Sequence, residues 1–197
     1  PGDALTHHNF GVFLRDQGDF GPAIEHLRQA VQLDTELTTA HEALVGALVA
    51  TGCGDEALRL AREFADPRPG NGAALAMQAA ALFAQGQVEE AVDLYRRAAA
   101  IPTPNPDSAL FLDYGYALIA AGDAAEATKQ FVRAVELDPR SARARVALAV
   151  SPLRPIYDDV AQMEASRRAF ARAVGELDAW CTPARAAAAA PAVGSSM

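Results

Sequence analysis

An internal period of 34 residues is the feature that most constrains how this chain can fold. Gly18, Gly52 and Gly86 stand 34 residues apart, and Gly122 follows 36 residues later. Each glycine has a leucine four residues before it and an alanine five residues after it. Four such copies, in a chain of 197 residues with 14 glycines, identify a repeat protein.

Each copy is predicted to contain two helices of about 13 residues, because apolar residues recur at spacings of three and four on both sides of the glycine. The glycine ends the first helix in the left-handed conformation that other residues resist. Small residues, such as Gly11 with Ala23 and Gly115 with Ala127, let the two helices cross closely. One helix pair cannot cover its own apolar face, so the expected fold is all-α, a right-handed superhelical α-solenoid of stacked pairs.

The composition excludes several classes of protein. The chain is 51% hydrophobic but only 7% aromatic, and alanine supplies much of the apolar content, so few strands are expected. A net charge of −8 argues against binding to nucleic acid or to an anionic membrane surface. No apolar run approaches the roughly 18 residues of a membrane span. Cys53 and Cys181 have no metal-ligand spacing, which favours reduced thiols and a cytoplasmic location.

The period and the glycine phrase resemble the tetratricopeptide repeat (TPR) over residues 4 to about 150. The fourth copy matches best, with Tyr114, Gly115, Leu118, Ala127, Phe131, Ala134 and Pro139 at the positions typical of the family. The predicted array has full repeats at 4–37, 38–71, 72–105 and 108–141 and a partial fifth repeat from 142.

The remaining segments are expected to join or cap this array. Three alternating prolines in 101–107 predict a longer turn between repeats, with a functional hinge as the alternative. Prolines interrupt the fifth repeat, so 151–181 is predicted to hold a joining segment and an amphipathic capping helix. Residues 182–197 are rich in alanine and proline and are interpreted as a linker or tail.

The TPR resemblance implies a peptide-binding groove lined by the first helix of each repeat. The corresponding residues are His8, Asn9, Val12, Arg15, Asp16, Glu42, Gly46, Val49, Ala76, Met77, Ala80, Phe83, Leu112, Asp113, Tyr116 and Ile119. TPR modules that clamp a carboxylate use Lys and Asn at these places, whereas most of these residues are apolar or small. We therefore expect an extended or helical polypeptide segment with apolar side chains, anchored by Phe83 and Tyr116. The alternative is that part of this stripe packs against another repeat, a subunit or the chain's own tail.

Catalytic and metal-binding patterns are hard to find. His7 and His41 occupy equivalent repeat positions and are expected to be neighbours, while His8 should point toward the groove. Packing and groove lining are favoured over a metal site for these histidines. No enzyme activity, metal or other cofactor is expected of this chain. The competing hypotheses are self-association, a glycosyltransferase site, or a histidine metal site within it.

A closer resemblance comes from the C-terminal segment. Residues 153–158 and 163–170 are similar to the region that joins the TPR array to the catalytic part in bacterial SPINDLY-type, O-GlcNAc-transferase-like proteins. This resemblance implies a substrate-recognition arm of a protein O-glycosyltransferase, with the sugar-transferring domain downstream. The chain departs from eukaryotic members, which line the groove with asparagines, because Asn9 is followed at equivalent positions by Ala43, Met77, Asp113 and Ala147.

Charge is also unevenly distributed. Residues 140–172 carry a net +4, so the rest of the chain is strongly acidic. A basic segment of this kind is commonly a solvated helix face. The more specific alternative is a docking face for another domain.

Overall fold

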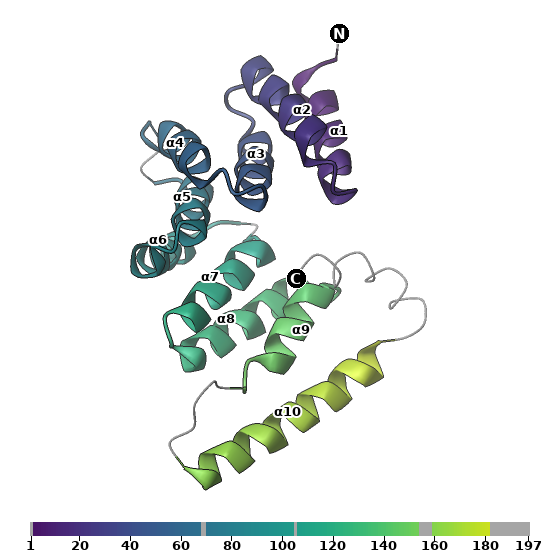
Figure 1. Cartoon of the computed structure of the whole chain (residues 1–197), viewed down its shortest axis with the longest axis vertical. Helices are drawn as coiled ribbons and strands as arrows, with labels where there is room; N and C mark the ends of the chain where they lie inside the picture. Colours follow the sequence, from purple (N-terminus) through teal and green to yellow (C-terminus); the bar gives the residue numbers. More distant parts are fainter. Residues whose placement is uncertain (1, 68–69, 105, 154–158, 182–197) are drawn as a thin grey trace. The chain divides into compact units, whose positions relative to one another are not determined.

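The structure is a computed structural model that describes residues 2–67, 70–104, 106–153 and 159–181 (Figure 1). These residues form ten helices, and no strand occurs among them. The helices are α1 (Ala4–Asp16), α2 (Phe20–Leu33), α3 (Thr38–Ala50), α4 (Gly54–Ala65), α5 (Gly72–Ala84), α6 (Val88–Ala100), α7 (Ser108–Ala120), α8 (Ala124–Leu137), α9 (Ala142–Val150) and α10 (Val160–Trp180). The all-α prediction is confirmed.

The recurring glycine is the turn between the two helices of a pair. Gly18, Gly52, Gly86 and Gly122 have φ angles of 85°, 77°, 77° and 84°, a region that disfavours other residues. The residue after each glycine then donates its N–H to the carbonyl of the repeat leucine, as Asp19 does to Leu14 at 2.9 Å. This bond closes the first helix and explains the fixed spacing between leucine and glycine.

Small residues allow the paired helices to approach, as predicted. A Cβ atom on Gly11 would lie 2.7 Å from Leu27 Cγ and 3.2 Å from the carbonyl oxygen of Ala23, and a Cβ atom on Gly115 would collide with the ring of Phe131. Ala23 is fully buried. The alanine and glycine content of the repeat therefore sets the distance between helices.

The chain divides into two compact units, Pro1–Pro102 and Thr103–Met197. Unit 1 contains α1 to α6, and each helix packs against the next along the chain. Its first helices also contact one another, α1 with α3 and α3 with α5, so they form a continuous wall. Tyr95, Leu27, Leu48 and Val45 are the largest fully buried side chains of this unit.

Unit 2 contains α7 to α10. Helix α8 packs against α7 and α9, and α10 packs on α9 (Figure 1). The Ser166 hydroxyl donates to the carbonyl of Pro152, and the Arg145 guanidinium lies over the Trp180 ring at 4.8 Å. The amphipathic segment predicted as a cap does cover the last helix of the incomplete fifth repeat.

The boundary between the two units, after Pro102, falls within the proline-containing segment 101–107. Among the described residues, no helix is both long enough and apolar enough to cross a membrane.

Candidate peptide-binding surfaces

The predicted groove residues lie on two surfaces, one in each unit. The unit-1 surface comprises those on α1, α3 and α5, and the unit-2 surface comprises those on α7. Most of the predicted residues are exposed or half-buried. Met77 and Leu112 are only 4% and 5% exposed, so they pack in the interior and offer little surface to a ligand.

The centre of the unit-1 surface is built mainly from small residues, with the exposed Glu42 one helical turn before Gly46 on α3. Gly46 has open space where a side chain would be, with no atom within 4 Å of an added Cβ. Ala76 and Ala80 are half-buried on α5, and Val49 and Phe83 are half-buried near the ends of α3 and α5. A chain segment could therefore lie close to the helix backbones here, with Phe83 at one side.

Polar groups at the α1 side of this surface are engaged with one another. Arg15 donates from Nε and Nη2 to Asp16 Oδ1, at 3.2 and 2.9 Å, and His8 Nδ1 donates to Asn9 Oδ1 at 3.1 Å. Arg15 is the one cation among the predicted residues of unit 1, and its charge is already matched by a carboxylate. This arrangement is poorly suited to clamping an anionic chain end.

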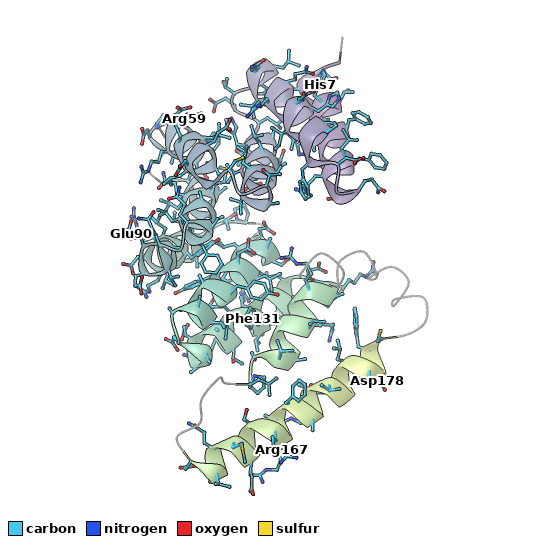
Figure 2. All side chains as sticks on the ribbon, viewed as in Figure 1. His7, Arg59, Glu90, Phe131, Arg167 and Asp178 are labelled. Carbon is cyan, nitrogen blue, oxygen red and sulfur yellow. The ribbon has the colours of Figure 1, made fainter. Side chains whose placement is uncertain are left out.

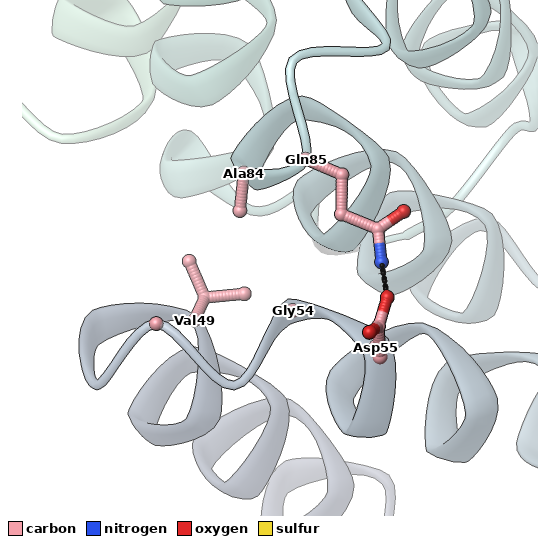
Figure 3. Close-up of a pocket in the computed structure, with 6 residues that line it drawn as sticks. Val49, Gly54, Asp55, Ala84 and Gln85 are labelled. Carbon is pink, nitrogen blue, oxygen red and sulfur yellow. Dashed lines mark hydrogen bonds between the residues drawn. The ribbon is translucent and has the colours of Figure 1, made fainter.

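A small cavity of about 150 Å³ adjoins the unit-1 surface (Figure 3). It is lined by Val49, Gly52, Gly54, Asp55, Ala84 and Gln85. Gln85 Nε2 donates to Asp55 Oδ1 at 2.8 Å, which ties the turn after α5 to the first turn of α4. The groove pattern missed Asp55 and Gln85 because they lie outside the first helices. Their one sequence signal is nearness to a repeat glycine: Gln85 directly precedes Gly86, and Asp55 follows Gly52 by three residues.

On the unit-2 surface, Tyr116 and Ile119 project to solvent. They are 37% and 41% exposed, one turn apart on α7. The ring of Phe131 on α8 (labelled in Figure 2) packs edge to face against the ring of Tyr116, with centroids 5.4 Å apart, and so supports the tyrosine side chain. An aromatic side chain held in this way, with the exposed Ile119 one turn away, suits the docking of an apolar ligand group.

Asp113 adds an acidic group to the unit-2 surface. Burial raises the pKa of this carboxyl from 3.8 to about 6, opposed by the charge of Arg143 and reinforced by that of Asp107. Burial also raises the pKa of Tyr116, again against the influence of Arg143. Arg143 is not among the predicted groove residues, because it lies in the incomplete fifth repeat, at the position equivalent to Ala109 of the fourth.

The histidines have structural contacts. His7 Nδ1 and His26 Nδ1 are 2.9 Å apart and share one hydrogen bond, and their rings stack at 5.2 Å. His41 is buried, donates from Nε2 to the carbonyl of Thr35 at 3.1 Å and packs on Phe64 at 4.3 Å. The hydrogen-bond partner of His7 is thus His26 of its own repeat. Groups of three or more His, Cys, Asp or Glu side chains suited to a metal are absent from the described part of the chain.

Comparison with solved structures identifies the architecture. A thermophilic TPR protein of Thermus thermophilus, TTC0263, superposes with a TM-score of 0.67 at 18% identity, covering 87% of this chain and 90% of that one. PilF of Pseudomonas aeruginosa gives a TM-score of 0.62 at 18% identity, covering 86% and 76%. The chain has a TPR-like repeat fold.

Another TPR neighbour is YrrB, described as a TPR protein with an unusual peptide-binding site. Its TM-score is 0.52 at 22% identity, covering 89% of this chain and 84% of that one. At these identities the likeness concerns the TPR-like fold alone.

Sequence comparisons give shorter matches. The family model of the bacterial transcriptional activator domain matches residues 11–102, slightly less than half of the chain and all within unit 1. The CTR9 homolog of Arabidopsis thaliana is 34% identical over 107 residues, or 54% of this chain. The chain spans about a tenth of that relative's length.

Proposed function

We propose that the chain is a scaffold that binds a polypeptide segment on the first-helix surfaces of its TPR-like units. The observation that carries this proposal is the exposed Tyr116 on α7, whose ring is supported by Phe131, with the exposed Ile119 one turn away. The small residues around Gly46 and the half-buried Phe83 give unit 1 a comparable surface. Aromatic anchors beside small residues are the features by which helical grooves hold apolar side chains.

Displayed random peptides provide the test, because binders can be selected before the natural partner has been identified. Peptides selected on the intact chain are measured by fluorescence anisotropy against the wild type and the double variant Phe83→Glu/Tyr116→Glu. We expect at least about a tenfold loss of affinity, since each charge must be desolvated on an apolar contact surface. Circular dichroism should show unchanged helicity.

Val132→Glu is the matched control. Val132 is 39% exposed on α8, a second helix, and so lies outside the proposed surfaces. Its substitution should leave peptide affinity unchanged. Equal binding by the double variant and the wild type would refute the assignment of these surfaces.

A narrower proposal is that this scaffold is the substrate-recognition arm of a protein O-glycosyltransferase. It rests on the sequence resemblance at 153–158 and 163–170, and residues 154–158 lie outside the described part of the chain. The complete natural gene product should then transfer sugar from a nucleotide sugar to a protein bound by the arm. Absence of transfer to a bound protein would overturn this narrower role while leaving the scaffold proposal intact.

A second candidate is an interaction module of a transcriptional regulator. The match of residues 11–102 to the bacterial transcriptional activator domain favours it. The natural protein should then alter transcription of a reporter gene, and Phe83→Glu should weaken that effect at unchanged protein level. A reporter that does not respond to the wild type would exclude this role.

A further inference from the structure

Asp113 on α7 is an acidic residue at a position where other repeats place a buried apolar residue. The equivalent residues of the second, third and fifth repeats, Ala43, Met77 and Ala147, are 5%, 4% and 1% exposed. Asp113 is itself half-buried, and a charged group loses hydration there at a cost in free energy. The packing of the helices therefore does not account for an acidic residue at this place.

The carboxylate of Asp113 has no compensating partner in the part of the chain that the structure describes. None of the described residues forms a hydrogen bond or an ion pair with it, and Arg143 and Asp107 act on it through their charges alone. Fully enclosed carboxylate oxygens without a hydrogen bond are absent from the described residues, so the oxygens of Asp113 can be reached from solvent. Because buried charges in proteins are ordinarily paired, we expect the partner of this carboxylate to come from a ligand.

Tyr116 and Ile119 follow Asp113 at intervals of three residues, so successive members of this row are neighbours on α7. The charge of Asp113 accordingly helps to raise the pKa of Tyr116. Both Tyr116 and Ile119 are exposed. The row thus offers a ligand one acidic group, one aromatic ring and one aliphatic side chain.

A basic side chain of a bound polypeptide fits this combination of groups. Its charged end can pair with the carboxylate while its methylene groups lie on apolar surface. Arginine suits the row better than lysine, because a planar guanidinium donates two hydrogen bonds to one carboxylate and also stacks on an aromatic ring. A divalent metal ion fits poorly, since it needs several ligands and the described residues hold no group of three or more suitable side chains.

We propose that the polypeptide bound on the unit-2 surface presents an arginine or lysine whose charged group pairs with the carboxylate of Asp113 beside Tyr116. This inference rests on the proposed scaffold function and adds the chemistry of the ligand. An apolar residue next to the basic one in the ligand would contact Ile119. The carboxylate then contributes to binding and not to folding.

Displayed random peptides show which side chains the unit-2 surface selects. Peptides are selected on the wild type after removal of those that also bind Tyr116→Glu, which leaves those that need the unit-2 surface. We expect basic residues to be enriched in them, and not in peptides selected in the same way on Asp113→Asn. Peptides that depend on Tyr116 but lack basic residues would overturn this inference and leave the scaffold proposal intact. Absence of any peptide that depends on Tyr116 would refute both for this surface.

A double-mutant cycle measures the pairing directly. One selected peptide and its counterpart with glutamine in place of the basic residue are titrated against the wild type and Asp113→Asn by fluorescence anisotropy. Each change alone should weaken binding about tenfold, and the two together should weaken it little further, because both remove the same charge-assisted hydrogen bonds. Additive losses would overturn the pairing. Asp113→Asn removes a half-buried charge, so its helicity and its stability to urea at neutral pH should not fall.

Glu136→Gln is the matched control, because it removes the same charge from an exposed position on α8, outside the proposed surface. It should bind the peptide as the wild type does. Arg143→Gln tests whether Asp113 serves its own neighbour instead. Because this change removes a nearby positive charge, the basic peptide should bind at least as tightly as it binds the wild type. A loss equal to that of Asp113→Asn would show that Asp113 acts by positioning Arg143, and would overturn the proposal.

Discussion

At the scale of single residues, Gly115 and Gly46 are both helical glycines with opposite surroundings. Gly115 faces the ring of Phe131, whereas no atom lies within 4 Å of an added Cβ at Gly46. The first sets how closely α7 and α8 approach, and the second lies on an open surface. The same substitution should therefore have effects of opposite sign at the two positions.

Gly115→Ala should lower the free energy of unfolding by about 1–3 kcal/mol, because the added methyl group overfills a close crossing. Gly46→Ala should raise it by about 0.5–1 kcal/mol, because alanine has the higher helix propensity and meets no obstacle. Urea unfolding followed by circular dichroism measures both. Equal effects of the two substitutions would contradict the packing described for Gly115.

The stability of unit 2 is predicted to depend on pH because of the carboxyl group of Asp113. Its pKa of about 6 in the folded chain exceeds the ordinary value of 3.8, so the folded state binds the proton more tightly. The free energy of unfolding should consequently fall as pH rises from about 4 to about 6.5, by about 1–2 kcal/mol relative to Asp113→Asn, after allowance for partial exposure. Urea unfolding of both proteins at several pH values provides the measurement, and parallel curves would contradict the burial of this carboxyl.

At the scale of elements, α10 depends on local interactions more than the other long helices do. Only Ser166 is buried among its residues, and its main packing among the described helices is against α9. Its first turn is fixed by Asp159, whose carboxylate accepts the N–H of Gln162 at 2.7 Å. This N-cap hydrogen bond should therefore determine how often α10 unfolds locally.

Asp159→Ala should destabilise α10 by about 1 kcal/mol through loss of the cap. Amide hydrogen exchange should be roughly fivefold faster in α10 and unchanged in α7 and α8. Asp178→Ala is the control, because it removes a carboxylate from the last turn of α10, where a negative charge is unfavourable, and leaves the cap intact. Unchanged exchange in Asp159→Ala would show that α10 is held by packing alone.

The helix pairs could be predicted from the sequence because their signals are local. The leucine, glycine and alanine of each copy act within one turn and one crossing, so their spacing alone predicted a pair of helices around each repeat glycine. The two-helix phrase also predicted where Gly11 and Ala23 meet.

The details of the two surfaces depended on tertiary neighbours and could not be predicted in the same way. Burial of Met77 and Leu112 and the pairing of His7 with His26 require the actual packing of adjacent helices. The influence of Arg143 on Asp113 crosses from the fourth repeat into a repeat that the sequence leaves incomplete. No motif marks such a juxtaposition.

At the scale of the whole molecule, the array consists of two units that each have their own interior. Tyr95 and Leu27 are among the side chains that fill unit 1, and Phe131 fills unit 2. The units are joined through a connection whose prolines cannot continue a helix.

Residues 1–102 and 103–197, expressed separately, should therefore each fold. We expect their circular dichroism spectra, weighted by length, to sum to that of the whole chain, and each to unfold cooperatively in urea. In the whole chain, replacing residues 103–106 with a Gly-Ser linker should leave the urea unfolding transitions of both units unchanged. A fragment lacking helical signal would contradict the presence of an independent core in that unit.

The open space at Gly46 also provides a position for a reporter. A cysteine placed there, after replacement of the exposed Cys53 and Cys181, could carry a fluorescent dye without displacing any side chain. Because the dye would project from the middle of the unit-1 surface, its emission would change when a ligand excludes water from that surface. Occupancy of the surface could then be followed in real time, before the ligand itself has been identified.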